Sequence, residues 1–192
     1  MKCPTDKKVI LASNSPRRRQ LLSGIVPEFS IAESRDINEQ YPDSLPAEQV
    51  APFLSQLKAE GYSDLIDNQS VLITADTVVI LDNQILGKPA SEDDAVHMLS
   101  RLSGRTHKVI TGVTLKTTEK THTFSSSTLV DFDVLDEDEI RRYVREFKPF
   151  DKAGSYGIQE WIGYRAIKKI DGCFYNVMGL PLNRLYTELK KV

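Results

Sequence analysis

The sequence predicts an α/β fold with a mixed sheet, because apolar strand-like runs alternate along the chain with helix-like segments. Val71–Leu81 is a long, β-branched run typical of a central strand. Thr106–Lys116 and Thr121–Leu135 alternate in the manner of a hairpin. With 192 residues, 40% of them hydrophobic, the chain can bury the core of one domain, or of one domain with two lobes around a cleft.

Composition and charge argue against several classes of protein. The formal net charge is -2, so no overall basic field attracts nucleic acid or anionic lipid. Cys3 and Cys173 are far apart and no Cys/His cluster is present, so neither a zinc site nor a disulfide framework is expected. The N-terminal stretch is polar and no apolar run approaches about 20 residues, which predicts a cytoplasmic protein without a signal peptide or membrane span.

The chain is expected to begin with a strand, a turn and a helix. Val9–Ala12 is a short apolar run, followed by a polar turn that ends at Ser15. Ser15 is a favourable N-cap, Pro16 suits the first helical position and Gly24 ends the helix. Before the central strand we expect a second strand at Phe29–Ala32 and a helix from Pro46 to about Gly61.

After the central strand, turn and cap residues mark the remaining elements. Asp82-Asn83 predicts a tight turn into a short strand, and Ser91 caps a helix that continues to about Leu102. Asp136 is expected to begin another helix, which Pro149 ends. The last expected elements are a turn-rich stretch at 151–163, a strand at Tyr164–Ile170 and a helix at Leu180–Leu189.

An arginine triplet occupies a position where helices ordinarily disfavour positive charge. Arg17-Arg18-Arg19 falls in the first turn of the predicted helix, where the helix dipole is positive and backbone N–H groups are free. A bound anion would resolve this conflict. A solvated basic stripe is the alternative, because basic triplets are common, but the strand–turn–helix setting favours an anion site.

An aspartate interrupts the central apolar run. An isolated carboxylate in a buried strand is costly unless it is paired or binds a metal. A strand-end aspartate bonded to nearby backbone is the alternative, but the apolar run continues on both sides of Asp76. A partly desolvated aspartate beside a metal or lysine is a natural general base.

Two further segments combine lysine with glycine, although the P-loop pattern is absent. Gly87-Lys88-Pro89 follows the predicted hairpin, and its alternative reading is an ordinary turn with a surface lysine. The segment 151–159 holds two glycines that allow close approach to a ligand. Within it, Lys152 can meet phosphate and Gln159 offers both a donor and an acceptor, whereas a plain loop is the alternative.

Several aromatic and histidine side chains are assigned structural roles by default. His107 is expected to be structural or on the surface, because three scattered histidines without a nucleophile signature form no triad. Trp161 and Tyr164 could stack on a base, but core packing is the expectation for both.

Taken together and in order, five segments resemble the motifs of Maf-like nucleoside triphosphate pyrophosphatases. Each motif is weak alone, but five in the right order and spacing are specific, and the resemblance covers nearly the whole chain. The segments are Leu11–Arg18, Ala75–Val79, Gly87–Pro89, Ser103–His107 and Asp151–Gly154.

The resemblance implies hydrolysis of a nucleoside triphosphate to a monophosphate and pyrophosphate with a divalent cation, Mg²⁺ or Mn²⁺. It implies an elongated, twisted mixed sheet flanked by helices, with two lobes and a central cleft, as a single domain over residues 1–192 that often forms a homodimer. Asp76 matches the family's proton acceptor, and Glu39 the second acidic residue, which gives the expected metal ligands. The expected substrate-binding residues are Ser13, Ser15, Arg17, Arg18, Lys58, Thr77, Lys88, Lys152 and Gln159.

The choice of substrate is expected to depend on the segment around Gln159. Ser155–Gln159 is similar to the branch that acts on dTTP and UTP, and differs from the branch that acts on 7-methyl-GTP. A glutamine amide can accept from N3–H and donate to O4 of uracil or thymine. Glu160-Trp161-Ile162 departs from the more usual glycine-rich continuation.

Two functions of other classes stay open from the sequence. The family is associated with septum inhibition, so the chain could be a nucleotide-binding regulator of septum formation without significant catalysis. A nucleic-acid-binding module that uses Arg17–Arg19 is the second, and the net charge of -2 speaks against it. The preferred metal and the choice among dTTP, UTP and modified pyrimidine triphosphates are not fixed by the sequence.

Overall fold

The structure is a computed structural model that describes residues 3–192. Met1 and Lys2, part of the polar start considered above, lie outside the described residues. The strands are β1 (Lys8–Leu11), β2 (Ser30–Ile31), β3 (Ser70–Leu81), β4 (Gln84–Leu86), β5 (Thr106–Lys116), β6 (Thr121–Phe132) and β7 (Ile167–Asp171). The helices are α1 (Pro16–Ser23), α2 (Ala47–Gly61), α3 (Glu92–Leu102), α4 (Glu137–Phe147), α5 (Trp161–Ala166), α6 (Phe174–Met178) and α7 (Leu182–Leu189), with 3₁₀ turns η1 (Ser63–Leu65) and η2 (Ala153–Ser155).

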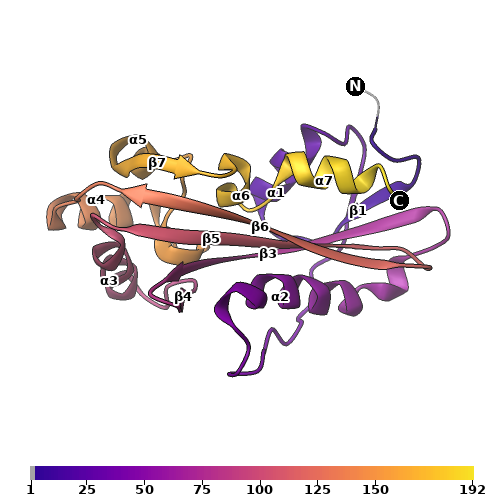
Figure 1. Ribbon diagram of the computed structural model, residues 1–192, viewed down its shortest axis with the longest axis horizontal. Coiled ribbons are helices and arrows are strands. Elements are labelled where there is room, and N and C mark those ends of the chain that lie inside the picture. The colour runs from indigo at the N-terminus through magenta and orange to yellow at the C-terminus, as the bar shows by residue number, and fades with distance from the viewer. Residues whose placement is uncertain (1–2) are drawn as a thin grey trace. The chain divides into compact units, whose positions relative to one another are not determined.

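The strands form one seven-stranded mixed sheet, which confirms the predicted α/β class. The strand order is β2-β1-β3-β5-β6-β7, and β4 pairs with β3 beside this path (Figure 1). β1 is parallel to both β2 and β3, whereas β4 and β7 are antiparallel to their neighbours. No helix within residues 3–192 combines the length and the apolar character needed to cross a bilayer.

The chain divides into two compact units, and both draw on the three long strands. Unit 1 comprises Met1–Asp76, Thr111–Ser126 and Gly179–Val192. Unit 2 comprises Thr77–Ile110 and Ser127–Met178. The boundary in β3 therefore falls between Asp76 and Thr77.

In unit 1, α2 covers one face of the sheet and α7 the other (Figure 1). Buried hydroxyls fix α2 in place: Thr74 Oγ1 donates to the Ser55 carbonyl at 2.6 Å, and the hydroxyls of Ser55 and Thr114 are 2.9 Å apart. Gly112 on β5 permits the close approach, because a Cβ there would overlap the backbone of α2 at Pro52. These contacts determine which face of α2 meets the sheet.

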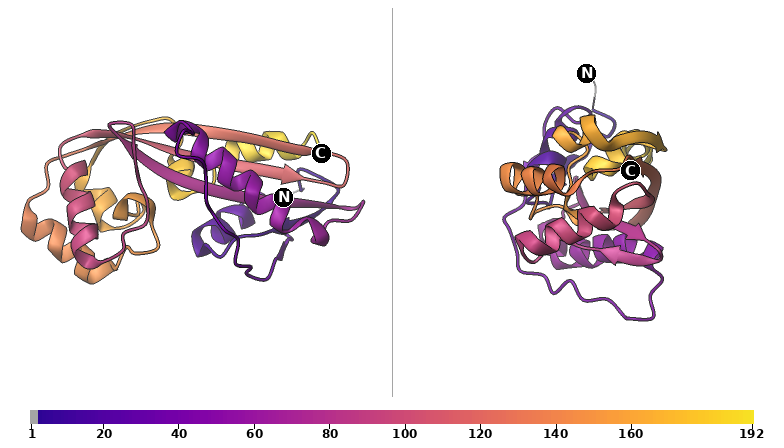
Figure 2. Two further views of the ribbon diagram at one scale, coloured as in Figure 1. Left: turned by 90° about the horizontal axis from the view of Figure 1, so that it is seen from below. Right: turned by 90° about the vertical axis from the view of Figure 1, so that its left-hand side faces the viewer.

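In unit 2, helices α3 and α4 contact each other and lie side by side (Figure 2). The predicted caps are confirmed, since Ser91 caps α3 and Asp136 forms a capping box with Glu139 at the start of α4. The predicted tight turn before β4 is also confirmed, because Asp82 and Asn83 have φ of 52° and 60°. The fully buried side chains of this core include Leu99, Leu102, Val130, Tyr143 and Ile162.

Three predictions in the second half of the chain are wrong. The strand expected at Tyr164–Ile170 begins only at Ile167, because the preceding residues form α5. Gly163 brings α5 against the backbone of Ile158, and Arg165 pairs with Glu139 at 2.5 Å, so tertiary packing stabilises a helix where a strand was predicted. As a result, Tyr164 is 86% exposed and does not pack in the core. Trp161, at the start of α5, is partly buried and packs against the core, as predicted. The strand expected to reach Leu135 ends at Phe132.

Candidate functional site

The turn between β1 and α1 has the predicted cap and uses both of its serine hydroxyls. Ser15 is the N-cap, and its hydroxyl accepts from the backbone N–H of Arg18 at 3.4 Å. The Ser13 hydroxyl accepts from the N–H of Ser15 at 3.2 Å. Pro16 is the first residue of α1, and the first turn carries no acidic residue. The two predicted phosphate-binding serines therefore already shape the loop that leads into the helix.

Arg18 links this helix to the central strand. Its guanidinium donates to the carbonyls of Ala75, at 2.9 Å, and Gly179, at 2.8 Å. Burial lowers the pKa of Arg18, and the nearby carboxylate of Asp76 opposes that effect. Arg19 donates to the Ser13 carbonyl at 3.3 Å. Arg18 thus has a structural role, which the sequence did not indicate, in addition to its predicted contact with substrate.

Lys58 brings two predicted acidic residues together. Its ammonium lies 2.6 Å from Asp76 Oδ1 and 3.0 Å from Glu39 Oε2. The side chains of Lys58 and Asp76 are each 15% exposed, whereas that of Glu39 is 49% exposed. We call Glu39, Lys58 and Asp76 the acidic cluster.

The fold of unit 1 explains where the acidic cluster lies. In β3 only Asp76 and Thr77 are half-buried, and every other residue of the strand is buried. β1 pairs with β3 as far as Leu11 opposite Ile73, so Asp76 lies just beyond the carboxyl end of that parallel pairing. Ligands of open α/β sheets bind at this edge. Lys58 reaches it because it follows Ser55, the anchored residue of α2, by about one turn.

The donor set of the acidic cluster fits a hard divalent cation. Two carboxylates converge on one point, where Lys58 supplies the positive charge. Within residues 3–192 no group of three or more His, Cys, Asp or Glu side chains is arranged to hold a metal ion. Two carboxylates without further protein ligands suit Mg²⁺, which usually retains waters and binds substrate phosphate oxygens.

In unit 2, the two lysine- and glycine-containing segments are joined through their backbones. The N–H of Gly154 donates to the carbonyl of Gly87 at 3.0 Å, so the segment of Lys88 lies against that of Lys152. Gly154 has φ of 67°, and a Cβ there would lie 2.9 Å from the side chain of Val79. Glycine is therefore required by both conformation and space, and the segment is more than a plain loop.

Lys152 is almost buried and has two carboxylate partners. Its side chain is 9% exposed, and its ammonium lies 2.8 Å from Asp151 Oδ1 and 3.1 Å from Glu160 Oε1. The second carboxylate oxygen of Glu160 accepts from the hydroxyl of Tyr143. No sequence pattern indicated Tyr143 as part of a site, and the only signal for Glu160 was its departure from the more usual glycine-rich continuation.

The amide of Gln159 has an unsatisfied acceptor. Its Oε1 atom is buried and has no hydrogen-bond partner among the described residues. A buried acceptor left unpaired costs about 1–3 kcal/mol, so such atoms are rare unless a ligand satisfies them. The sequence expectation that Gln159 accepts a hydrogen bond from a base is therefore consistent with its surroundings.

His107 has the structural role that was expected. It is buried, and its Nε2 lies 2.7 Å from the hydroxyl of Tyr156. Desolvation lowers the pKa of His107 to about 4. Tyr156 belongs to the segment of Lys152 and Gln159, so a neutral His107 supports that segment from the core.

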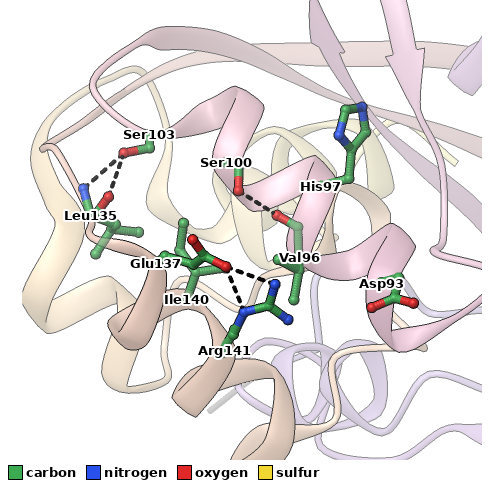
Figure 3. Close-up of a pocket in the computed structure, with 9 residues that line it drawn as sticks. All are labelled: Asp93, Val96, His97, Ser100, Ser103, Leu135, Glu137, Ile140 and Arg141. Atoms are coloured by element: carbon green, nitrogen blue, oxygen red, sulfur yellow. Dashed lines mark hydrogen bonds and ion pairs between the residues drawn. The ribbon is translucent and has the colours of Figure 1, made fainter.

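A separate pocket of about 480 Å³ lies between α3 and α4 and contains none of the predicted site residues. Asp93, His97 and Ser100 of α3 line it, together with Glu137 and Arg141 of α4 (Figure 3). Glu137 and Arg141 pair with each other at 2.7 Å across one helical turn. The pocket is thus an open, polar hollow whose ion pair is already satisfied, and it is not the candidate site.

Comparison with known proteins matches nearly the whole chain. The family model described as "Maf-like protein" matches residues 8–192. A protein of Bacteroides thetaiotaomicron named "dTTP/UTP pyrophosphatase" is 49% identical over 185 residues, which cover 96% of each chain. One of the same name from Porphyromonas gingivalis (strain W83) is 51% identical over 185 residues, covering 95% of this chain and 93% of its own. Among solved structures, the Staphylococcus aureus Ham1 protein has a similar fold, with a TM-score of 0.50 and 14% identity over 66% of this chain and 72% of its own.

Proposed function

This chain belongs to the Maf-like protein family, and from that premise we propose that it hydrolyses dTTP and UTP to the monophosphate and pyrophosphate. Relatives about half identical over nearly all of both chains are named for this activity. The observation that carries the chemistry is the acidic cluster, in which Asp76 is held 2.6 Å from Lys58 on an otherwise buried strand.

Asp76 is assigned as the general base. Its carboxylate accepts a proton from water as the water oxygen bonds to the α-phosphorus of the substrate. The bond from that phosphorus to the α–β bridging oxygen breaks, and the electron pair leaves with pyrophosphate. Lys58 orients the carboxylate, because its ammonium donates a hydrogen bond to Asp76 Oδ1 at 2.6 Å.

Asp76 and Glu39 are assigned as the residues that would hold a divalent cation. When bound, Mg²⁺ or Mn²⁺ would supply positive charge that offsets the charge developing on the phosphate oxygens. Glu39 is the more exposed carboxylate of the acidic cluster and can turn from Lys58 towards the cation with little loss of packing.

The remaining predicted residues are assigned to the triphosphate and the base. A triphosphate carries several negative charges, so cations from more than one segment are needed to bind it. We assign Arg17, Lys88 and Lys152 to the phosphates, with Ser13, Ser15 and Arg18 shaping the turn and adding donors. Gln159 is assigned to the pyrimidine edge, which its unpaired Oε1 supports, and Thr77 contributes to substrate choice.

We treat residues 1–192 as one functional domain, since a single family model spans both units. The resemblance also supports a homodimer that acts on the nucleotide pool of the cytoplasm. Light scattering on the purified protein measures the oligomeric state, and a monomer at working concentrations would contradict this part alone.

Pyrophosphate release from a panel of triphosphates tests the proposed function. With Mg²⁺ present, dTTP and UTP are expected to give the highest kcat/KM, ahead of dCTP, GTP and 7-methyl-GTP. A clear preference for 7-methyl-GTP would place the chain in the other branch. Tight triphosphate binding with no pyrophosphate release would instead favour a nucleotide-binding regulator.

A further inference from the structure

We propose that Glu160 is a positioning residue, which holds the ammonium of Lys152 in place for phosphate through a network that ends at Tyr143. The inference rests on the proposed function, in which Lys152 binds the phosphates. All three residues belong to unit 2. Neither Glu160 nor Tyr143 was predicted as a site residue from the sequence. The side chain of Glu160 is 18% exposed, and Tyr143 is fully buried.

The two carboxylates beside Lys152 are not equivalent. Asp151 is the neighbouring residue in the chain, and its side chain is 55% exposed. Glu160 is only 18% exposed. The Lys152 side chain is only 9% exposed, so its ammonium needs a lasting partner, because an unpaired buried charge is strongly destabilising. Glu160 is suited to be that partner, whereas an incoming phosphate can replace the exposed Asp151.

Tyr143 fixes the other side of the Glu160 carboxylate. Its hydroxyl donates to Glu160 Oε2 and accepts from the backbone N–H of Gly157 at 3.1 Å. Tyr143 is fully buried in α4, where its ring stacks on Phe147 and Trp161. Desolvation and the hydrogen bond to Glu160 raise the pKa of Tyr143, so its hydroxyl remains a donor under physiological conditions. The carboxylate therefore cannot rotate without losing a buried partner.

Gly157 provides the space in which the carboxylate lies. A Cβ at Gly157 would be 2.7 Å from the carboxyl carbon of Glu160. The N–H of Glu160 also donates to the carbonyl of Gly157 at 2.9 Å, which closes a turn around Gln159. The same network thus fixes both ends of the segment that carries Lys152 and Gln159.

The direction in which phosphate binding changes when the Glu160 carboxylate is removed distinguishes a positioning role from simple proximity. A carboxylate that only lies near the phosphates would repel them, so its removal would strengthen phosphate binding. A carboxylate that holds Lys152 has the opposite effect, because its removal lets the ammonium move. In a variant that already lacks Lys152, removing the Glu160 carboxylate should then have no further effect on phosphate binding.

Calorimetric binding of inorganic pyrophosphate with Mg²⁺ tests the inference, using Glu160→Ala, Lys152→Ala and the double variant. Glu160→Ala is expected to weaken pyrophosphate binding roughly tenfold in the otherwise wild-type chain and to change it less than about twofold in the Lys152→Ala background. Tyr143→Phe should show a smaller loss with the same dependence on Lys152. In turnover, Glu160→Ala should raise KM more than it lowers kcat. Glu137→Gln, on the same helix as Tyr143 and paired with Arg141, is the matched control and should leave binding unchanged.

Binding that is stronger or unchanged in Glu160→Ala, or losses that multiply in the double variant, would overturn the inference. If Glu160→Ala fails to fold, Glu160→Gln and Tyr143→Phe carry the same comparison. Wild-type protein that binds pyrophosphate but releases none from dTTP or UTP would refute the proposed function alone. Wild-type release combined with independent effects at residues 160 and 152 would refute only the positioning role.

Discussion

Two lysines, Lys58 in unit 1 and Lys152 in unit 2, are each held by two carboxylates, but the surroundings of those carboxylates differ. Around Lys58, Asp76 lies on a strand and Glu39 is half exposed, so both can exchange the lysine for another partner. Around Lys152, Glu160 is held on its second oxygen by the buried Tyr143. The same pairing of residue types therefore gives an adaptable cluster in one unit and a fixed one in the other.

The difference indicates that unit 1 is suited to catalysis and unit 2 to recognition of phosphate. A general base and a metal ligand must change partners during each turnover, which suits the acidic cluster of unit 1. A residue that recognises phosphate benefits from a fixed position, because ordering it beforehand removes part of the cost of binding. Unit 1 is thus expected to control kcat, whereas changes in unit 2 are expected to act mainly on KM and stability.

Asp76→Asn should produce the largest effect. Removing a general base typically reduces the rate by a factor of 10²–10⁴, so we expect kcat to fall about 1000-fold with dTTP while the protein stays folded. Steady-state pyrophosphate release and circular dichroism measure the two quantities. Asp82→Asn is the control, because Asp82 is exposed at the end of the same strand and asparagine tolerates its positive φ. Near wild-type turnover in Asp76→Asn would refute the assignment of Asp76 as the general base.

Glu39→Gln should change the requirement for metal. Loss of one of two carboxylates is expected to raise the Mg²⁺ concentration for half-maximal activity by about tenfold or more, while saturating Mg²⁺ restores most of kcat. Chelation of the wild type with EDTA should abolish activity, and added Mg²⁺ should restore it. Glu28→Gln, an exposed carboxylate outside the acidic cluster, serves as the control. Activity of the wild type that survives complete chelation would contradict the role of the acidic cluster.

Gly154→Ala should destabilise the segment that carries Lys152. The residue has φ of 67°, and its Cβ would lie 2.9 Å from Val79, so we expect a loss of about 2 kcal/mol and a lower Tm. Thermal unfolding measures the change. Gly87→Ala is the matched control, because nothing lies within 4 Å of its Cβ. Equal Tm values for the two variants would show that the segment is not constrained as described.

Protonation of the buried His107 should give the smallest effect, which is a loss of stability in mildly acidic solution. Its pKa is about 4 in the folded protein and 6.5 in the unfolded chain, so below 6.5 the unfolded state binds the additional proton. Stability should therefore fall as the pH drops through 6.5 towards 4, and the loss at pH 6 relative to pH 8 is about 0.8 kcal/mol. Denaturant unfolding at several pH values measures this loss. His107→Phe should remove that part of the pH dependence, whereas the exposed His97→Gln should retain it.

Local signals in the sequence predicted most of the fold and part of the candidate site. The N-cap of α1, the turn before β4 and the position of Asp76 on β3 depend on neighbouring residues, and all were correct. The pairing of Lys58 with Asp76 depends on how α2 packs on the sheet, which the sequence did not reveal. Tyr143 and Glu160 meet only because α4 packs against the segment of Lys152, so neither was predicted as a partner. The structure of α5 was mispredicted for the same reason, since packing at Gly163 determines it.

The fate of solvent oxygen tests most directly the claim that Asp76 activates water for attack at the α-phosphorus. Hydrolysis of dTTP in ¹⁸O-labelled water, followed by ³¹P NMR and mass spectrometry, identifies the phosphorus that is attacked. We predict ¹⁸O in dTMP, unlabelled pyrophosphate, and formation of labelled dTMP about 1000-fold more slowly with Asp76→Asn. Label in the pyrophosphate, or release of orthophosphate and dTDP, would contradict the assigned reaction.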